Sequence, residues 1–96
     1  MGYHPMYDYM RVDAEPKLLQ ITSEPYVIFT KRGYQPVVNV LEKKRKMNLI
    51  LFISPVTLTR QLEPLREENN GQFIGLEFWI RKESYEKTSS YILEPF

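Results

Sequence analysis

The sequence predicts a mainly β fold, because segments rich in β-branched and aromatic residues follow one another in a recognisable order. These segments are residues 17–31, 34–42, 47–54, 73–82 and 88–95. Between the third and the fourth, residues 55–69 have the spacing of a single helix. Three strands, a helix and two strands is the chain order of a five-stranded OB-fold-like Greek-key barrel, a fold that often holds oligonucleotides.

The first segment is long and is predicted to bend. Pro25 interrupts it, and a bend or bulge at residues 23–25 is how a small barrel turns a corner. Lys31-Arg32-Gly33 then supplies a tight turn, in which Gly33 can adopt a positive φ. We therefore assign residues 17–96 to the barrel. Residues 1–16 lack a clear period and are assigned to an extended N-terminal arm, which either packs on the barrel or stays loose.

The third segment is apolar on both faces. Leu49, Leu51 and Ile53 alternate with a second set that contains Ile50 and Phe52, so a covering layer is needed on each side. The helix, the N-terminal arm, a second subunit or a ligand could each cover Ile50 and Phe52, and the sequence does not choose between them.

The helical segment carries one narrow apolar stripe. Leu58, Leu62 and Leu65 have i, i+4, i+7 spacing, which is typical of a helix that plugs one end of a barrel. Pro64 predicts an interruption, either a kink or two short turns. Asn69-Asn70-Gly71 marks the expected end of the helix.

The fourth β segment alternates cleanly, and this alternation sets the only tryptophan apart. One face carries Ile74, Leu76, Phe78 and Ile80, and the other carries Gly75, Glu77, Trp79 and Arg81. Trp79 is therefore predicted on the polar side of its strand. Three roles remain open: packing under the arm or at a barrel edge, stacking on a nucleobase, and contact with a second subunit.

Composition excludes several classes of function. The 96 residues make one domain without room for a deep enzymatic cleft, and no apolar run approaches the ~20 residues of a membrane span. There is no cysteine, and His4 is the only histidine, so neither a histidine-based triad nor a three-ligand zinc site can be assembled. We therefore expect a non-enzymatic protein without metal or cofactor, which is cytoplasmic and does not enter a membrane.

Charge is nearly balanced overall but unevenly distributed. The formal net charge is +1, yet residues 31–46 hold six basic residues against one acid, Glu42. The helical segment is mildly acidic, so the electrostatic field is polarised. The basic run at residues 43–46 would suit a phosphate backbone, although a merely solubilising turn would look the same.

The second half of the chain also carries a resemblance. Lys46-Met-Asn-Leu-Ile-Leu-Phe-Ile-Ser precedes the leucine-containing helix, and Gly71-Gln-Phe-Ile-Gly-Leu-Glu-Phe-Trp-Ile-Arg-Lys and Thr88-Ser-Ser-Tyr91-Ile-Leu-Glu-Pro follow it. This succession resembles small phage-type and archaeal single-stranded DNA-binding proteins, and at pattern level the likeness covers about residues 17–95. It implies an OB-fold that binds single strands, in the setting of viral or archaeal DNA replication, recombination or repair.

Single-strand binding would draw on two kinds of side chain. Cations neutralise phosphates and release counterions, and aromatic rings stack on bases. The candidate cations are Lys31, Arg32, Lys43, Lys44, Arg45, Lys46, Arg81, Lys82 and Lys87. The candidate aromatic residues are Tyr34, Trp79 and Tyr85, with Tyr91 as a further one. The expected partner is single-stranded DNA or, failing that, RNA.

A second function class competes with this one. A small β-barrel that binds protein, as a homodimer or as a regulator docked on a partner, would also have a near-neutral charge, a doubly apolar third segment and a tyrosine-rich arm. Salt distinguishes the two classes, because affinity for nucleic acid falls steeply with salt and an apolar protein interface does not weaken in that way.

Overall fold

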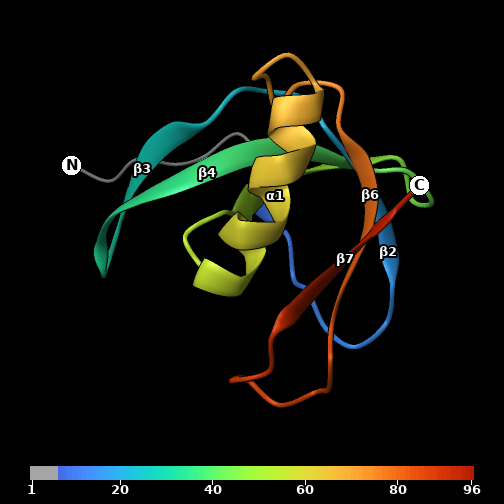
Figure 1. The fold of residues 1–96 in the computed structure, drawn as a ribbon. Coiled ribbons are helices and arrows are strands. Elements are labelled where there is room, and N and C mark those ends of the chain that lie inside the picture. Colours follow the sequence, from blue (N-terminus) through green and yellow to red (C-terminus); the bar gives the residue numbers. More distant parts are fainter. Residues whose placement is uncertain (1–6) are drawn as a thin grey trace.

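Seven strands and one helix make up the computed structural model, which describes residues 7–96 (Figure 1). The strands are β1 (Asp8–Tyr9), β2 (Lys17–Ile21), β3 (Tyr26–Thr30), β4 (Gly33–Glu42), β5 (Met47–Phe52), β6 (Glu77–Lys82) and β7 (Tyr91–Pro95). Helix α1 (Val56–Glu68) lies between β5 and β6 in the chain. All strands belong to one sheet in the order β1-β5-β4-β2-β6-β7, and β3 pairs with β4 off this path. The mainly β prediction with one helix is confirmed.

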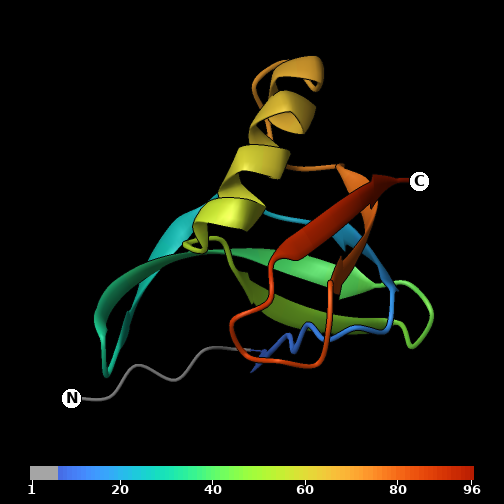
Figure 2. The same cartoon turned by 60° about the horizontal axis from the view of Figure 1, so that its bottom comes forward.

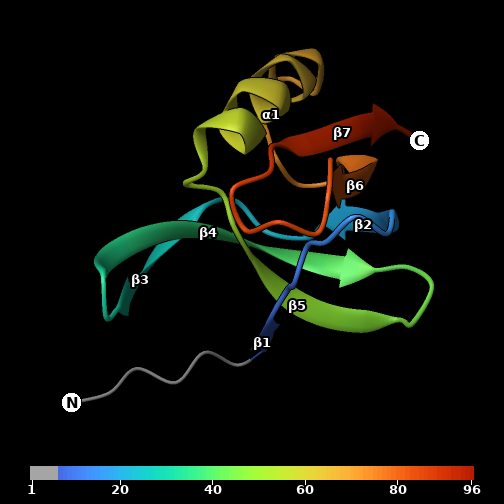
Figure 3. The same cartoon turned by 90° about the horizontal axis from the view of Figure 1, so that it is seen from below.

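The predicted long first strand is two strands. β2 and β3 both pair antiparallel with the ten-residue β4, β2 with its C-terminal half and β3 with its N-terminal half. The break falls at residues 22–25, where Pro25 cannot continue a ladder. Hydrogen bonds from Thr22 N to Asn39 O (2.8 Å) and from Asn39 N to Ser23 Oγ (2.9 Å) hold the corner. Beyond it, the β3–β4 hairpin projects from the rest of the sheet (Figure 3).

The sheet does not close, so the predicted five-stranded closed barrel is not confirmed. Within residues 7–96, β7 pairs with β6 alone. Side chains of α1 occupy its other edge: Leu93 N donates to Gln61 Oε1 (2.8 Å), Gln61 Nε2 donates to Tyr91 O (2.7 Å), and Tyr91 N donates to Thr57 Oγ1 (3.2 Å). Figure 3 shows α1 lying alongside β7. The helix thus satisfies backbone groups that a closing strand would otherwise pair.

Helix α1 runs without interruption through Pro64, contrary to the predicted break. Proline removes the hydrogen bond to the carbonyl four residues earlier, here that of Arg60. Both Pro64 and Arg60 are exposed, so water can reach that carbonyl. The helix ends as expected, with Asn69 as C-cap and Gly71 at φ 77° donating to Arg66 O (2.9 Å).

The main core lies between α1 and the concave side of the sheet (Figure 2). Leu58 and Leu62 are buried in it and Leu65 packs against it, which confirms the predicted leucine stripe. From the sheet come alternate residues of the strands, namely Leu19, Ile21, Val38, Val40, Leu49, Leu51, Phe78 and Ile80.

The N-terminal segment covers the second face of β5. β1 runs parallel to β5, with Asp8 opposite Leu49 and Tyr9 opposite Ile50. Tyr9 and Phe52 are in ring contact with centroids 5.1 Å apart, and Tyr7 packs against the small cluster that contains Ile50. Of the coverings left open by the sequence, the arm therefore contributes, and Ile28 of β3 and Val37 of β4 are buried in the same cluster as Ile50. His4 and the rest of residues 1–6 lie outside the described residues.

The fourth β segment begins later than its alternation suggested. β6 starts at Glu77, while residues 73–76 form a turn in which Gly75 has φ 96° and Ile74 is exposed. The Glu24 carboxylate accepts hydrogen bonds from the N–H groups of Phe73 (3.0 Å) and Ile74 (2.8 Å). These hydrogen bonds to Glu24 hold residues 73 and 74 in the turn, so the strand begins only at Glu77 although the alternation starts at Ile74.

Candidate nucleic-acid interface

Trp79 stands on the outer face of the sheet, as its strand alternation predicted. In β6, Phe78 and Ile80 point into the main core, and the Trp79 side chain between them is 39% exposed. Cross-strand register places Leu18 of β2 on one side of Trp79 and Glu94 of β7 on the other. Residues directly opposite one another share a face, so these three side chains form a row across three strands.

Two hollows meet at Trp79. The larger, about 550 Å³, lies between β2 and the β4–β5 turn; its lining is Glu15, Pro16, Lys17, Leu18, Glu42, Lys43, Lys44, Arg45 and Trp79. The smaller, about 340 Å³, lies over β6 and β7; its lining is Pro16, Trp79, Arg81, Ile92 and Glu94. Trp79 and Pro16 line both, so these two residues lie where the two shallow hollows adjoin.

The structure brings four predicted cations to this face together with Trp79. Lys43, Lys44 and Arg45 come from the β4–β5 turn and line the larger hollow, while Arg81 lies two residues along β6 and lines the smaller. Cations from the β4–β5 turn and from β6 itself therefore lie near one indole. This arrangement can offer an aromatic face with cations on either side of it.

Most of these cations already have a carboxylate partner. Lys43 Nζ lies 3.6 Å from Glu77 Oε2, and Arg81 Nη2 lies 3.6 Å from Glu94 Oε1. No ion pair of Lys44 occurs among residues 7–96, so Lys44 is the lining cation whose charge is least compensated. The face is therefore basic only in part.

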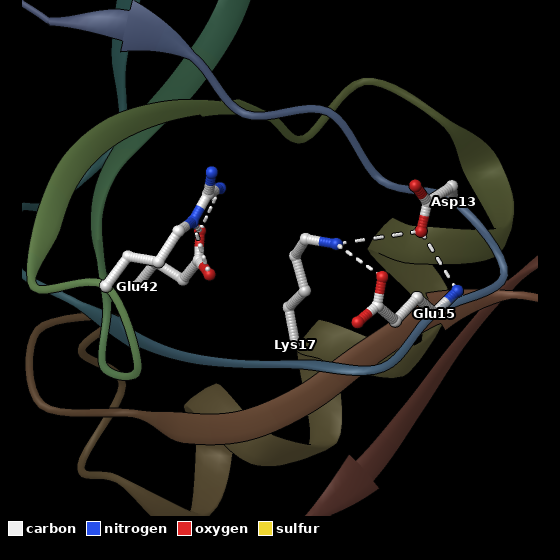
Figure 4. A network of polar contacts seen from close by, with 5 residues as sticks. Asp13, Glu15, Lys17 and Glu42 are labelled. Carbon is white, nitrogen blue, oxygen red and sulfur yellow. Dashed lines mark hydrogen bonds and ion pairs between the residues drawn. The ribbon is translucent and has the colours of Figure 1, made fainter.

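Arg45 is committed to a structural pair. Its guanidinium forms a bidentate hydrogen bond with Glu42, whose side chain is only 4% exposed at the end of β4. These hydrogen bonds, and the charge of Glu42 in second place, raise the pKa of Arg45 above its ordinary value. Figure 4 shows Glu42 and its partner on one side of Lys17, whose Nζ points the other way, toward the carboxylates of Asp13 (3.7 Å) and Glu15 (3.9 Å).

Three predicted site residues lie at the opposite end of the molecule. Lys31 and Arg32 form the tip of the β3–β4 hairpin, and Tyr34 follows on β4 with 74% of its surface exposed. Figures 1 and 3 place this tip and the β4–β5 turn at opposite ends of the sheet. The structure therefore does not bring Lys31, Arg32 and Tyr34 to Trp79.

The remaining predicted residues lie on or near other turns. Lys46 ends the β4–β5 turn at φ 55° and is exposed, but it does not line either hollow. Tyr85 and Lys87 are exposed in the β6–β7 connection. Lys82 Nζ lies 5.2 Å from the ring centroid of Tyr91, and burial of that ring raises the pKa of Tyr91. Tyr91 packs against the main core.

Several residues of this face were not found from the sequence. Leu18 and Pro16 provide apolar lining, and Glu77 and Glu94 provide the competing carboxylates. Leu18 had left a signal, because it is the apolar residue that breaks the alternation between Lys17 and Gln20. Alternation had placed Glu77 on the face of Trp79, but its pairing with Lys43 and that of Glu94 with Arg81 left no signal, since the partners come from different segments.

Comparison of the chain with protein-family models, with curated proteins and with solved structures gives no match. Within residues 7–96, no group of three or more histidine, cysteine or carboxylate side chains is placed to share a metal ion. The helix in the same range is not long and apolar enough to cross a membrane. The geometry around Trp79 is therefore the feature that bears on function.

Proposed function

We propose that this protein binds single-stranded nucleic acid, without catalysing a reaction, on the outer face of β2, β6 and β7. The observation that carries the proposal is the half-exposed Trp79 between two hollows that cations line from both sides. Base–aromatic stacking is worth about 1–3 kcal/mol per base and tolerates any base. The expected ligand is accordingly single-stranded DNA, with RNA as the alternative, bound with little sequence preference.

The strand pairing supports an OB-like interpretation of the sheet. If β2 and β3 are taken as two halves of one bent strand, that strand pairs with β4 and with β6, β4 pairs with β5, and β6 pairs with β7. This is the neighbour relationship of an OB barrel, except for the closing contact between β5 and β7. In this interpretation α1 occupies the place of the missing contact.

The ion pairs of the face predict a modest affinity. A phosphate that approaches Lys43 or Arg81 must displace Glu77 or Glu94, whereas Lys44 can meet a phosphate directly. Exposed ion pairs of this kind are worth about 0.2–1 kcal/mol, so they weaken phosphate binding without preventing it. Stacking on Trp79 should therefore contribute more than charge.

A titration with oligo-dT at two or more salt concentrations tests the proposal. Binding should quench Trp79 fluorescence. The Trp79→Ala protein lacks this signal, so its binding is measured with a fluorescent label on the oligonucleotide. This substitution should weaken binding by about 1–3 kcal/mol and leave the salt slope nearly unchanged. Tyr85→Ala is the matched control, since Tyr85 is exposed but lines neither hollow.

Charge is tested separately with Lys44→Gln, which should lower the salt slope by about 0.7. Arg32→Gln, at the far end of the molecule, should leave both affinity and slope unchanged. Arg45 is a poor choice for this test because its removal would leave the buried Glu42 carboxylate without its partner. Absence of any affinity for oligo-dT or oligo-rU at low salt would refute the proposal.

A further inference from the structure

The outer edge of β3 is open, unlike that of β7. Among the described residues, β3 pairs only with β4. Val27 faces Pro36, which has no N–H, so the hydrogen-bonded pairs of this ladder are those of the alternate residues Tyr26, Ile28 and Thr30. The N–H and C=O groups of Val27 and Phe29 therefore point away from β4. No other described backbone group bonds to them.

The same two residues carry exposed apolar side chains. Val27 is 60% and Phe29 62% exposed, and the Phe29 ring contacts that of Tyr34 at 5.1 Å in an edge-to-face arrangement. Residues 25–41 contain no acid, while Lys31 and Arg32 form the turn. An unpaired edge with an apolar face is the kind of strand that soluble proteins normally cover.

We propose that β3 pairs antiparallel with β3 of a second copy of this chain, with Val27 of one copy opposite Phe29 of the other. This register uses all four free N–H and C=O groups of each edge in a symmetric pair. A register centred on Val27 would place Phe29 opposite Pro25, which cannot donate a hydrogen bond, and one centred on Phe29 would place Val27 opposite Lys31 in the turn.

Side chains and charges fit a second copy in the same register. Tyr34 and Phe29 of one copy would lie in line with Val27 and Pro36 of the other, which makes one row of apolar side chains across four strands. The twofold symmetry of the pair would create a second, identical row. The two basic turns would lie at opposite ends of the paired strands. Each turn would then lie near the residues that precede β3 in the other copy, among them the acidic Glu24, whose carboxylate accepts hydrogen bonds from the N–H groups of Phe73 and Ile74.

The mass of the protein in solution, without nucleic acid, is the first test. Sedimentation should show a mass that rises with concentration from the 11.5 kDa of one chain toward twice that value. Phe29→Lys should raise the dimer dissociation constant by about tenfold or more, as expected for the loss of a central aromatic contact. Val56→Lys, which replaces an equally exposed apolar residue on α1, should have no effect.

Cross-linking tests the register, and the natural chain has no cysteine to interfere. Directly opposite Cα atoms in a hydrogen-bonded pair lie about 5.5 Å apart, within disulfide range, whereas diagonal neighbours lie at about 7–8 Å. An equimolar mixture of Val27→Cys and Phe29→Cys proteins should therefore form more disulfide dimer than either variant alone.

Three results would overturn the proposal. One is a monomer mass at every concentration that the protein tolerates. Another is cross-linking of a single variant that equals that of the mixture. The third is a Phe29→Lys protein that loses oligo-dT binding while its mass distribution stays unchanged, which would assign this face to nucleic acid. Circular dichroism of each variant verifies that it is folded. Because no nucleic acid is needed for the mass and cross-linking tests, they can fail without affecting the proposed function.

Discussion

At the scale of single residues, carboxylates moderate the face around Trp79. Arg81 can bind either Glu94 or a phosphate, and the pair with Glu94 must open before a nucleic acid gains the charge. Glu94→Gln should therefore strengthen oligo-dT binding at low salt, by up to about fivefold if the pair is worth up to 1 kcal/mol. Glu68→Gln makes the same charge change on α1 outside both hollows and should not alter affinity. Equal effects of the two substitutions would mean that only net charge matters.

Tyr91 gives a residue-scale prediction about pH. Burial raises its pKa above the ordinary value, so the folded protein keeps this proton to a higher pH than the unfolded chain does. Above about pH 10 the unfolded chain binds fewer protons, and the free energy of unfolding must fall as pH rises. Tyr91→Phe should flatten this decline in urea unfolding between about pH 9 and 11, whereas Tyr85→Phe, at an exposed site, should not. The prediction would be contradicted if the free energy of unfolding declined identically with pH in the unaltered protein, Tyr91→Phe and Tyr85→Phe.

At the scale of elements, α1 acts as the protecting neighbour of β7. The Gln61 amide bonds both Tyr91 O and Leu93 N, as the backbone of an adjacent strand would. Gln61→Ala should lower the free energy of unfolding by about 1–3 kcal/mol, because it leaves both backbone groups without their partner. Arg60→Ala, at the exposed neighbouring position, is the control. Urea unfolding measures the stability of both variants. Equal free energies of unfolding for Gln61→Ala and the unaltered protein would show that water replaces the Gln61 amide at no cost.

At the scale of the whole molecule, the N-terminal segment joins the two apolar clusters. Met10 is buried in the main core and Tyr7 packs against the smaller cluster on the other face. The Met10 amide donates to Ile50 O at 2.7 Å. We expect this amide to exchange with solvent as slowly as the amides of β5, and the amide of the exposed Arg11 to exchange faster. Equal exchange at Met10 and Arg11, measured by NMR, would mean that β1 detaches from the sheet.

Local pattern was enough to predict most of the elements, although not β1, the division between β2 and β3, or the start of β6. The order of strands and helix, the leucine stripe of α1, the turn at Gly33 and the outward side of Trp79 all follow from spacing over a few residues. Such features depend on backbone geometry within one element, which the sequence determines directly. Pro64 was misread because its effect depends on whether solvent reaches the carbonyl of Arg60, and this accessibility is set by packing.

Only the tertiary structure decided which of these residues meet. Lys44, Trp79 and Arg81 are brought to one face because β2 pairs with both β4 and β6. The basic residues Lys31 and Arg32 instead form the tip of the β3–β4 hairpin, which lies at the far end of the sheet. The carboxylates that compete for the cations, and the helix side chains that keep the sheet open, likewise come from distant segments. These outcomes depend on strand register and on competition between packing partners, neither of which has a local signal in the sequence.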